Sequence, residues 1–362
     1  MLNKLRFFPC KYFAGRQVAA SSLLALAIFL ISPVAVVAQL PGERFGEVVP
    51  RDVREMYDAG LKYLSDTQSE SGDWSGSYAG GGVTGMAVMA FLASGEDPNF
   101  GLYSNNVRRG LRSIISGQNA STGIISDSMY QHGFATLALA EAYGAVDDRT
   151  LWPAGGVANS QRTIGEALEL AVRASVTSQK KNQFGAWRYS PDSNDADTSV
   201  SGAILVSLLA ARNAGIEVSD EAIDRAIAYF VSMTSDGGQV AYAGGFGGFD
   251  ESIARISIGA LVYAVSRRKD LPQYKSTINY LSENLEQPAR SYTQYARYYQ
   301  AQALFQGDVD AWERWNKQLV RELKASQADD GSFGGDFGTA VDTSLSLLAL
   351  ALNFRFLPIY ER

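Results

Sequence analysis

Residues 185–198 carry the densest set of side chains in the sequence that could perform acid–base or ligand-binding chemistry. They include an arginine, a tyrosine and three carboxylates: Arg188, Tyr189, Asp192, Asp195 and Asp197. A carboxylic acid that burial keeps protonated can act as a general acid, and two carboxylates can divide the acid and base roles between them. We therefore take Asp195 and Asp197 as candidate catalytic residues and the other three as candidate ligand-binding residues.

The only histidine of the chain, His132, is a further candidate catalytic residue. It follows Tyr130 and Gln131 at the start of a run of small apolar residues. An imidazole titrates near neutral pH and can serve as a general base. A histidine within an apolar helix can equally be a hydrogen-bonded core residue, so both interpretations stay open.

Other candidate ligand-binding side chains lie near the expected starts of apolar helices. They are a tyrosine before the histidine, a charged pair and a tyrosine-rich stripe: Tyr130, Asp250, Arg255, Tyr292, Tyr295 and Tyr299. Core packing is the other ordinary role for these tyrosines. If the helix starts meet at one end of the fold, all these side chains will surround one opening. The helix N-termini there would favour an anionic group of a ligand.

A recurring sequence gives Asp197 a structural explanation as well. Asp197-Thr198-Ser199 is repeated as Asp342-Thr343-Ser344 and, in part, as Asp127-Ser128. An aspartate followed by threonine or serine at the start of an apolar helix is typical of an N-cap. Asp192 and Asp195 have no counterparts in the other copies, so the stretch that contains them is the atypical one.

The elements that must position these residues are helices arranged in repeats. A unit of about 54 residues recurs six times: a helix with a charged stripe, a Gln- and Gly-containing loop with an aromatic residue, and an apolar helix. The first helices span Leu61–Gln68, Val107–Gln118, Ile164–Gln179, Ser219–Met233, Leu271–Leu285 and Ala311–Gln327. The second helices span Val83–Gly95, Tyr130–Gly144, Asp197–Gly215, Ser252–Ser266, Tyr292–Gly307 and Asp342–Leu352.

The apolar second helices must be buried on all sides, whereas the first helices can face water on their charged side. Six such pairs favour an all-α fold, an (α/α)6 toroid with parallel inner helices, over a linear helical solenoid. We expect the loop glycines to allow left-handed backbone and the loop aromatics, Trp74, Trp187 and Phe333, to fill gaps between helices.

Residues 1–38 are expected to be a secretory signal peptide. Four cations precede an apolar stretch, residues 18–37, which ends in the small-residue sequence Val36-Val37-Ala38. An uncleaved membrane anchor is the alternative, because the stretch approaches spanning length. We assign residues 39–51 to a linker and residues 52–362 to the toroid, and expect the protein in the periplasm or outside the cell.

Removal of residues 1–38 would leave 28 of the 32 cations against all 38 acids, a net charge of −10. Such a chain is a poor partner for nucleic acid or anionic lipid. The only cysteine, Cys10, lies in the removed segment, so we expect no disulfide and no thiolate chemistry in the exported protein.

The repeats resemble the prenyltransferase and squalene-cyclase (terpenoid cyclase) superfamily, here as an exported bacterial member with a single toroid. The resemblance rests on the Gln–Gly–Trp loops, on the helices that begin Val83-Thr84-Gly85 and Asp342-Thr343-Ser344, and on residues 185–198. It covers most of residues 52–352. It implies the toroid fold and, less specifically, a central cavity that holds an elongated ligand.

In squalene–hopene-type cyclases an Asp-x-Asp-Asp-Thr motif supplies the acid that protonates the substrate, and this chain has Asn194-Asp195-Ala196-Asp197-Thr198. Aligned on the Asp-Thr pair, Ala196 occupies the proton-donating position. Aligned on Asp-x-Asp, Asp197 is the acid. The single-toroid relatives, protein prenyltransferase β-subunits, use zinc held by Asp, Cys and His, which a chain with one histidine and no mature cysteine cannot build. We expect neither zinc nor another cofactor.

Other six-pair toroids are polysaccharide lyases and glycosidases, whose catalytic groups lie in a cleft at one end of the ring. The sequence therefore predicts an elongated ligand, isoprenoid-like or a glycan, in the central cavity. A non-catalytic scaffold for protein partners and a cyclase-like acid catalyst that uses Asp195 and Asp197 are the alternatives.

Overall fold

The computed structural model describes residues 49–74, 76, 78–153, 161–243, 251–354 and 356–357. The expected signal peptide, residues 1–38, most of the linker and the candidate Asp250 lie outside the described residues. The chain divides into two units, Met1–Val48 and Val49–Arg362, and everything below concerns the second unit. Among the described residues, no helix combines the length and apolar character that crossing a membrane requires.

Twelve α-helices form the described part of the chain, as the sequence predicts. The odd-numbered helices are α1 (Arg51–Thr67), α3 (Ser104–Ser116), α5 (Ile164–Lys181), α7 (Asp220–Ser232), α9 (Pro272–Glu283) and α11 (Val309–Ser326). The even-numbered helices are α2 (Gly81–Leu92), α4 (Met129–Ala142), α6 (Thr198–Asn213), α8 (Ile253–Val265), α10 (Thr293–Gly307) and α12 (Thr339–Leu350). Short 3₁₀ turns follow at Asp148–Thr150 and Ala351–Asn353.

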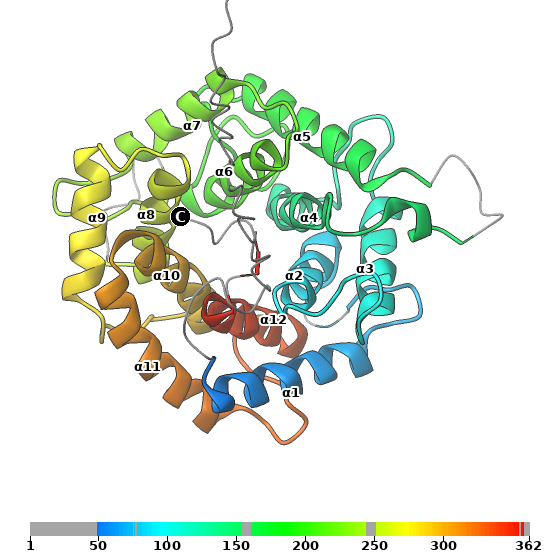
Figure 1. Ribbon diagram of the computed structural model, residues 1–362. Coiled ribbons are helices and arrows are strands. Elements are labelled where there is room, and N and C mark those ends of the chain that lie inside the picture. The colour runs from blue at the N-terminus through cyan, green and yellow to red at the C-terminus, as the bar shows by residue number, and fades with distance from the viewer. Residues whose placement is uncertain are drawn as a thin grey trace, which may run out of the picture. The chain divides into compact units, whose positions relative to one another are not determined.

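The even-numbered helices form an inner ring, and the odd-numbered helices surround it (Figure 1). Each inner helix packs against the next, and α12 packs against α2, so the ring closes. The outer ring also closes, because α11 packs against α1. The predicted (α/α)6 toroid is confirmed, and a linear solenoid, which would have free ends, is excluded for the described residues.

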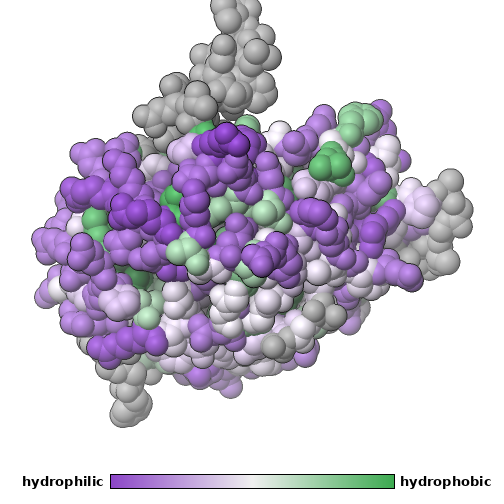
Figure 2. Space-filling view, turned by 90° about the horizontal axis from the view of Figure 1, so that it is seen from below, coloured by the Kyte–Doolittle hydropathy of each residue, from purple (hydrophilic) through white to green (hydrophobic). Residues whose placement is uncertain are grey.

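The division into inner and outer helices follows from side-chain polarity. In α6, thirteen of the sixteen residues are buried, and α2 contains no charged residue at all. The outer helix α3 is buried only along one stripe and presents arginines elsewhere. Seen from below the view of Figure 1, the described surface is largely hydrophilic and its apolar residues are scattered (Figure 2).

The loop glutamines hold neighbouring repeats together. Four outer helices have a glutamine within about two residues of their C-terminal end. Its side-chain amide donates two hydrogen bonds, one to a carbonyl of its own loop and one to a carbonyl of the next outer helix: Gln68, Gln118, Gln179 and Gln327. For Gln179 the acceptors are Gly185 and Ala222, both at 2.7 Å. A carboxamide with two N–H groups suits this position, because it pairs two main-chain acceptors at once.

The loop aromatics fill gaps between helices, as expected. Trp74, Trp187 and Phe333 are almost completely buried. The indole N–H of Trp74 donates to the Leu64 carbonyl at 2.9 Å, and that of Trp187 donates to the Ser175 carbonyl at 2.8 Å. These bonds satisfy the polar atom of a buried indole, so the tryptophans are part of the scaffold.

The capping predictions are confirmed in one of three cases. Asp197 is the N-cap of α6, and its Oδ1 accepts from the Val200 N–H at 2.8 Å. Asp127 is not a cap, because α4 is capped by Ser128. Asp342 lies inside the first turn of α12, whose N-cap is Gly338, and it accepts instead from the Phe337 N–H at 3.0 Å. The two predictions are wrong because the N-caps of α4 and α12 lie one residue after and four residues before the predicted positions.

Candidate binding cavity at the mouth of the ring

A cavity of about 530 Å³ opens where the inner helices begin. Its size falls within the range of small-molecule sites. Every inner helix contributes to it, through a residue in its first turns or in the loop before it. The lining residues are Tyr78, Val83, Met86, Tyr130, Gln131, Phe134, Tyr189, Ser199, Tyr242, Ser252, Ala254, Arg255, Ser291, Tyr292, Tyr295, Phe337, Val341 and Leu345.

One wall of the cavity is a set of three packed aromatic rings from repeats one, five and six. Tyr292 stacks on Phe337, with ring centroids 5.0 Å apart and planes within 16°. Tyr78 meets the same Phe337 edge-on at 5.5 Å. Tyr78 and Tyr292 are each half exposed, so their rings are available to a ligand.

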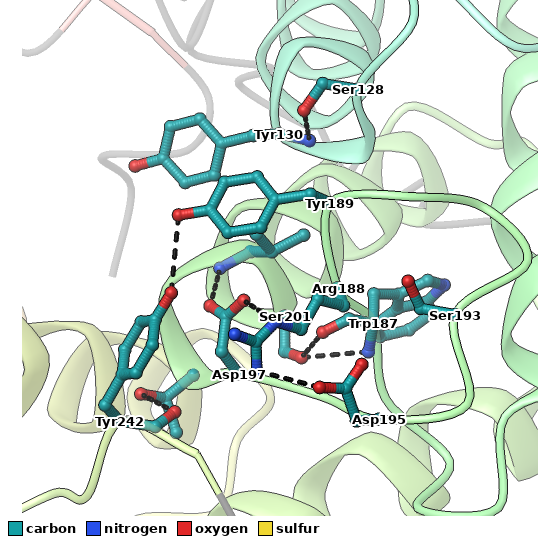
Figure 3. Close-up of polar contacts among 12 residues, drawn as sticks. Ser128, Tyr130, Trp187, Arg188, Tyr189, Ser193, Asp195, Asp197, Ser201 and Tyr242 are labelled. Carbon is teal, nitrogen blue, oxygen red and sulfur yellow. Dashed lines mark hydrogen bonds and ion pairs between the residues drawn. The ribbon is translucent and has the colours of Figure 1, made fainter. Parts of the chain in front are cut away.

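The aromatic lining continues from Phe337 to Tyr295, with ring centroids 6.3 Å apart, and carries more polar groups there. Tyr130 packs between Tyr189, at 6.5 Å, and Tyr295, at 6.2 Å. The Tyr189 hydroxyl lies 3.4 Å from the Tyr242 hydroxyl (Figure 3). The guanidinium of Arg255 lies 6.0 Å from the centre of the Tyr242 ring, and its Nε donates to the Val240 carbonyl at 3.0 Å.

Apolar side chains from α2, α4 and α12 complete the cavity. They are Val83, Met86, Phe134, Val341 and Leu345. These positions belong to helices that the fold must bury on every side, so the repeat itself produces an apolar lining. The cavity therefore has aromatic walls and an apolar inner surface.

Beside the cavity lies a cluster of charged residues around Arg188 (Figure 3). Asp195 is largely exposed, and its Oδ2 pairs with the Arg188 guanidinium at 3.0 Å. Asp197 is fully buried, and its Oδ2 lies 3.8 Å from Arg188 Nε without a hydrogen-bond partner. Arg188 also lies over the Tyr242 ring, at 5.5 Å.

Burial raises the pKa of Asp197 to about 6. The hydrogen bond from the Val200 N–H and the charge of Arg188 act in the opposite direction but do not cancel it. With this pKa the carboxyl of Asp197 is mostly ionised at neutral pH but is protonated to a larger extent than an ordinary aspartate. A raised carboxyl pKa is a property of catalytic acids and also of buried caps.

Five of the candidate residues line the cavity: Tyr130, Tyr189, Arg255, Tyr292 and Tyr295. Tyr299 lies behind Tyr295, with ring centroids 4.9 Å apart, and is buried. Arg188, Asp195 and Asp197 form the neighbouring cluster. The expectation that all candidates surround one opening is wrong for Asp192, which pairs with Lys181 at 2.5 Å and lies on a separate groove along α5.

Besides Phe134 of α4, three loop aromatic residues of the cavity were not among the candidates: Tyr78, Tyr242 and Phe337. Each lies in a loop that precedes an inner helix, at positions without a fixed spacing from the helix start. The signal was nevertheless present in the sequence, because four of the six loops carry an aromatic residue between the scaffold aromatic or glycine and the inner helix.

His132 is placed in the core of the ring. Its Nδ1 accepts from the Ile125 N–H at 3.1 Å, which puts the proton on Nε2, near the Ala171 carbonyl at 3.1 Å and Ser175 Oγ at 3.0 Å. The side chain is fully buried, and burial lowers its pKa to about 4. These contacts are those of a neutral core histidine that joins a loop of repeat two to α5.

We expect the stability of the fold to reveal this neutral histidine. The unfolded chain takes up a proton on His132 below about pH 6.5, while the folded protein stays neutral down to about pH 4. The native state therefore loses up to about 3 kcal/mol as the pH falls through this window. A His132→Gln variant is expected to be less stable than wild type at pH 7.5 and to show a smaller difference at pH 4.5.

Urea denaturation at both pH values measures this difference. The decrease of this difference at low pH depends on His132 alone, because every other titrating group is common to the two proteins. An equal loss for His132→Gln at both pH values would show that the imidazole binds its proton as readily in the folded protein as in the unfolded chain, and His132 would again be a candidate acid–base group.

Acidic side chains are absent from the described part of the cavity lining, which also has no histidine or lysine. Glycosidases place two carboxyl groups on either side of the scissile bond, at about 5 to 10 Å from each other. Across the described residues, no group of three or more His, Cys, Asp or Glu side chains could hold a metal ion.

No known protein family matches the sequence, and no curated protein matches it. Solved structures share the fold at low sequence identity. An α-amylase from Clostridium perfringens has a TM-score of 0.59 at 11% identity, over 84% of this chain and 99% of that one. A type II terpene cyclase from Scytonema, in complex with geranylgeranyl dihydroxybenzoate, has a TM-score of 0.57 at 14% identity, over 84% and 98%.

The GH76 α-mannanase of Bacteroides thetaiotaomicron gives a TM-score of 0.57 at 12% identity, over 86% of this chain and 97% of that one. The three proteins have different substrates, so the likeness concerns the toroid and not its chemistry. The resemblance to the squalene-cyclase type of repeat toroid is thus confirmed for the fold.

Proposed function

We propose that this protein binds an elongated, mostly apolar ligand of isoprenoid type in the cavity at the mouth of its toroid, and that it does so outside the cytoplasm. The observation that carries the proposal is the combination of half-exposed tyrosine rings at the opening with an apolar inner surface. Aromatic faces and aliphatic side chains gain free energy by removing apolar ligand surface from water. The terpene cyclase of the same fold is recorded with a geranylgeranyl compound, a molecule of this kind.

The polarity of the cavity favours this ligand over a glycan. A sugar presents hydroxyl groups around its whole edge, and a buried hydroxyl without a partner costs binding energy. Apart from tyrosine hydroxyls, the described lining offers three serines, Arg255 and one carboxamide. The Oε1 of that carboxamide, Gln131, already accepts from the Gly82 and Val83 N–H groups, at 2.7 and 3.2 Å.

Acid catalysis is the second candidate function, and Asp197 is the residue that supports it. Its buried Oδ2 has no hydrogen-bond partner, and its pKa of about 6 would keep a fraction protonated at neutral pH. A protonated carboxyl beside an aromatic-walled cavity is the arrangement that protonation of an alkene requires, since aromatic faces stabilise a developing cation. Asp197 does not line the cavity, so binding without chemistry is the better supported function.

Geranylgeraniol is the probe that tests the proposal. We expect wild-type protein to bind it, and a Phe337→Ala variant to bind it at least tenfold more weakly, because the substitution removes the ring that supports both Tyr78 and Tyr292. Equilibrium binding of the radiolabelled alcohol measures the effect. Phe100→Ala, which truncates an aromatic residue that is 89% exposed on the α2–α3 loop, is the matched control and should bind like wild type.

Two further measurements separate the alternatives. Binding of maltohexaose or mannohexaose, without binding of geranylgeraniol, would replace the isoprenoid by a glycan. If wild type binds neither class of compound, the ligand proposal fails, and the result favours the alternative of a non-catalytic scaffold for protein partners. Gas chromatography of the recovered alcohol detects cyclisation as a change in retention without a change in mass, and such a product would establish the acid-catalyst function.

A further inference from the structure

The backbone of Tyr292 is in a conformation that a tyrosine rarely adopts. Its φ of 56° and ψ of 50° lie in the left-handed region. Among the described residues other than glycine, only Ser126 and Arg267 share a positive φ. A bulky side chain at positive φ costs conformational free energy that a glycine avoids, and such residues gather at ligand sites.

The fold itself does not require tyrosine at this place. Tyr292 is the N-cap of α10, yet its side chain makes no capping hydrogen bond. The equivalent N-caps of α2 and α12 are glycines with positive φ, Gly80 at 126° and Gly338 at 91°. Their ψ values, −179° and 155°, place these glycines in the extended positive-φ region that glycine alone adopts readily, whereas Tyr292 is in the left-handed helical region. Repeat five therefore differs from these two repeats in both the residue and the backbone conformation at this position.

The side chain of Tyr292 is held by a neighbouring ring but remains half exposed. Phe337 covers one part of the ring, with the planes nearly parallel. Phe337 is fixed in turn, because its N–H donates to the buried carboxyl of Asp342 at 3.0 Å. Half of Tyr292 remains exposed at the cavity, so the ring is held by its neighbour without being buried.

We propose that Tyr292 is the specificity-determining residue of the cavity and selects ligands whose outer end is flat and unsaturated. Its left-handed backbone directs the ring over the opening, where it can stack on a planar double bond or ring of the ligand. A saturated chain of the same length lacks the flat π-face and gains less from this contact. The inference rests on the proposed ligand function and assigns the selective element within that site.

Two probes with the same carbon skeleton test it: geranylgeraniol, which has double bonds along its length, and phytanol, which has none. Binding of both and the urea denaturation midpoint are measured for wild type, Tyr292→Gly and Tyr292→Asn. We expect both variants to lose about tenfold in affinity for geranylgeraniol and less than twofold for phytanol. The midpoint should stay equal to that of wild type or rise, because glycine and asparagine tolerate the left-handed backbone.

Arg267→Gly is the matched control, since it relieves an equally left-handed residue, with a φ of 61°, that does not line the cavity. It should leave both affinities unchanged. A lower midpoint for both Tyr292 variants would show that the tyrosine ring stabilises the fold. Retained selectivity for geranylgeraniol over phytanol in either variant would show that the ring does not select the ligand. Either result would overturn this inference and leave the proposed function standing. If wild type binds neither probe, the proposed function fails, and the selective role fails with it.

Discussion

Replacement of Gly331 by alanine is expected to lower the free energy of unfolding of the ring strongly. The glycine has a φ of 88°, which for alanine costs about 1–2 kcal/mol. A Cβ at this position would lie 2.3 Å from the Ala59 carbonyl oxygen of α1, a main-chain atom that cannot move without shifting the helix. The expected loss in the free energy of unfolding is about 4 kcal/mol or more.

The size of this effect follows from where Gly331 lies. Its carbonyl accepts from the Gln327 amide, which also donates to the Met56 carbonyl, both at 2.9 Å. The bond to Met56 joins the sixth repeat to the first, and the bond to Gly331 holds the glutamine in place. A backbone shift that relieves the clash would also separate both acceptors from the glutamine, leaving buried polar groups unpaired.

Gly215→Ala is the matched control for Gly331→Ala. Gly215 has a similar φ of 96°, but a Cβ there meets no heavy atom within 4 Å. Its substitution therefore measures conformational strain alone, at about 1 kcal/mol. Urea denaturation followed by circular dichroism gives both values. Similar losses for the two variants would show that the ring closure tolerates a methyl group, and that repeats six and one are joined less tightly than described above.

Those same contacts explain why the fold could be predicted from the sequence. The glutamine, the positive-φ glycine and the buried aromatic residue act locally, within one loop and the adjacent outer helix. Each repeat therefore contains the residues that determine its own loop structure. Helix starts were less predictable. α1 begins at Arg51, well before the expected Leu61, and α12 begins at Thr339 rather than at Asp342. The added turns of α12 contain small residues without a hydrophobic period, whereas in α1 Val53, Met56 and Tyr57 continue the period of the later residues, so this start was present in the sequence but missed.

The cavity could be predicted only in part, because its walls come from loops of unequal length. Tyr130, Arg255, Tyr292 and Tyr295 were accessible to reasoning about helix starts, since they lie in the first turns of α4, α8 and α10. Phe337 and Tyr242 belong to the aromatic residues that recur in the loops, but only the closed ring brings these loops to the opening. The carboxylates of residues 185–198 were misleading for the opposite reason. Their spacing suggests a shared site, but the loop directs Asp192 outward to Lys181.

Whether Asp197 is more than a helix cap can be decided by the pH dependence of stability. Its pKa is raised to about 6 by burial, while that of an aspartate in an unfolded chain is about 3.8. Between these values the folded protein binds a proton that the unfolded chain releases. The native state therefore gains stability as the pH falls from about 6 to 4, by up to about 3 kcal/mol.

An Asp197→Asn variant removes this gain and keeps the cap. The Oδ1 of asparagine can still accept from the Val200 N–H, and the neutral amide resembles the protonated acid. We expect the variant to match or exceed the stability of wild type at pH 8, where wild type must bury a charge. At pH 4.5 wild type should have recovered about 2 kcal/mol relative to the variant.

The comparison is made between two proteins at each pH, because His132 changes the stability in the opposite direction over an overlapping window. Asp195→Asn serves as the control, since it removes the other carboxylate partner of Arg188 without touching the buried cap. Parallel pH profiles for wild type and Asp197→Asn would mean that Asp197 is ionised in the fold throughout this range. It would then be a cap paired with Arg188, and the acid-catalyst function would lose the one residue on which it depends.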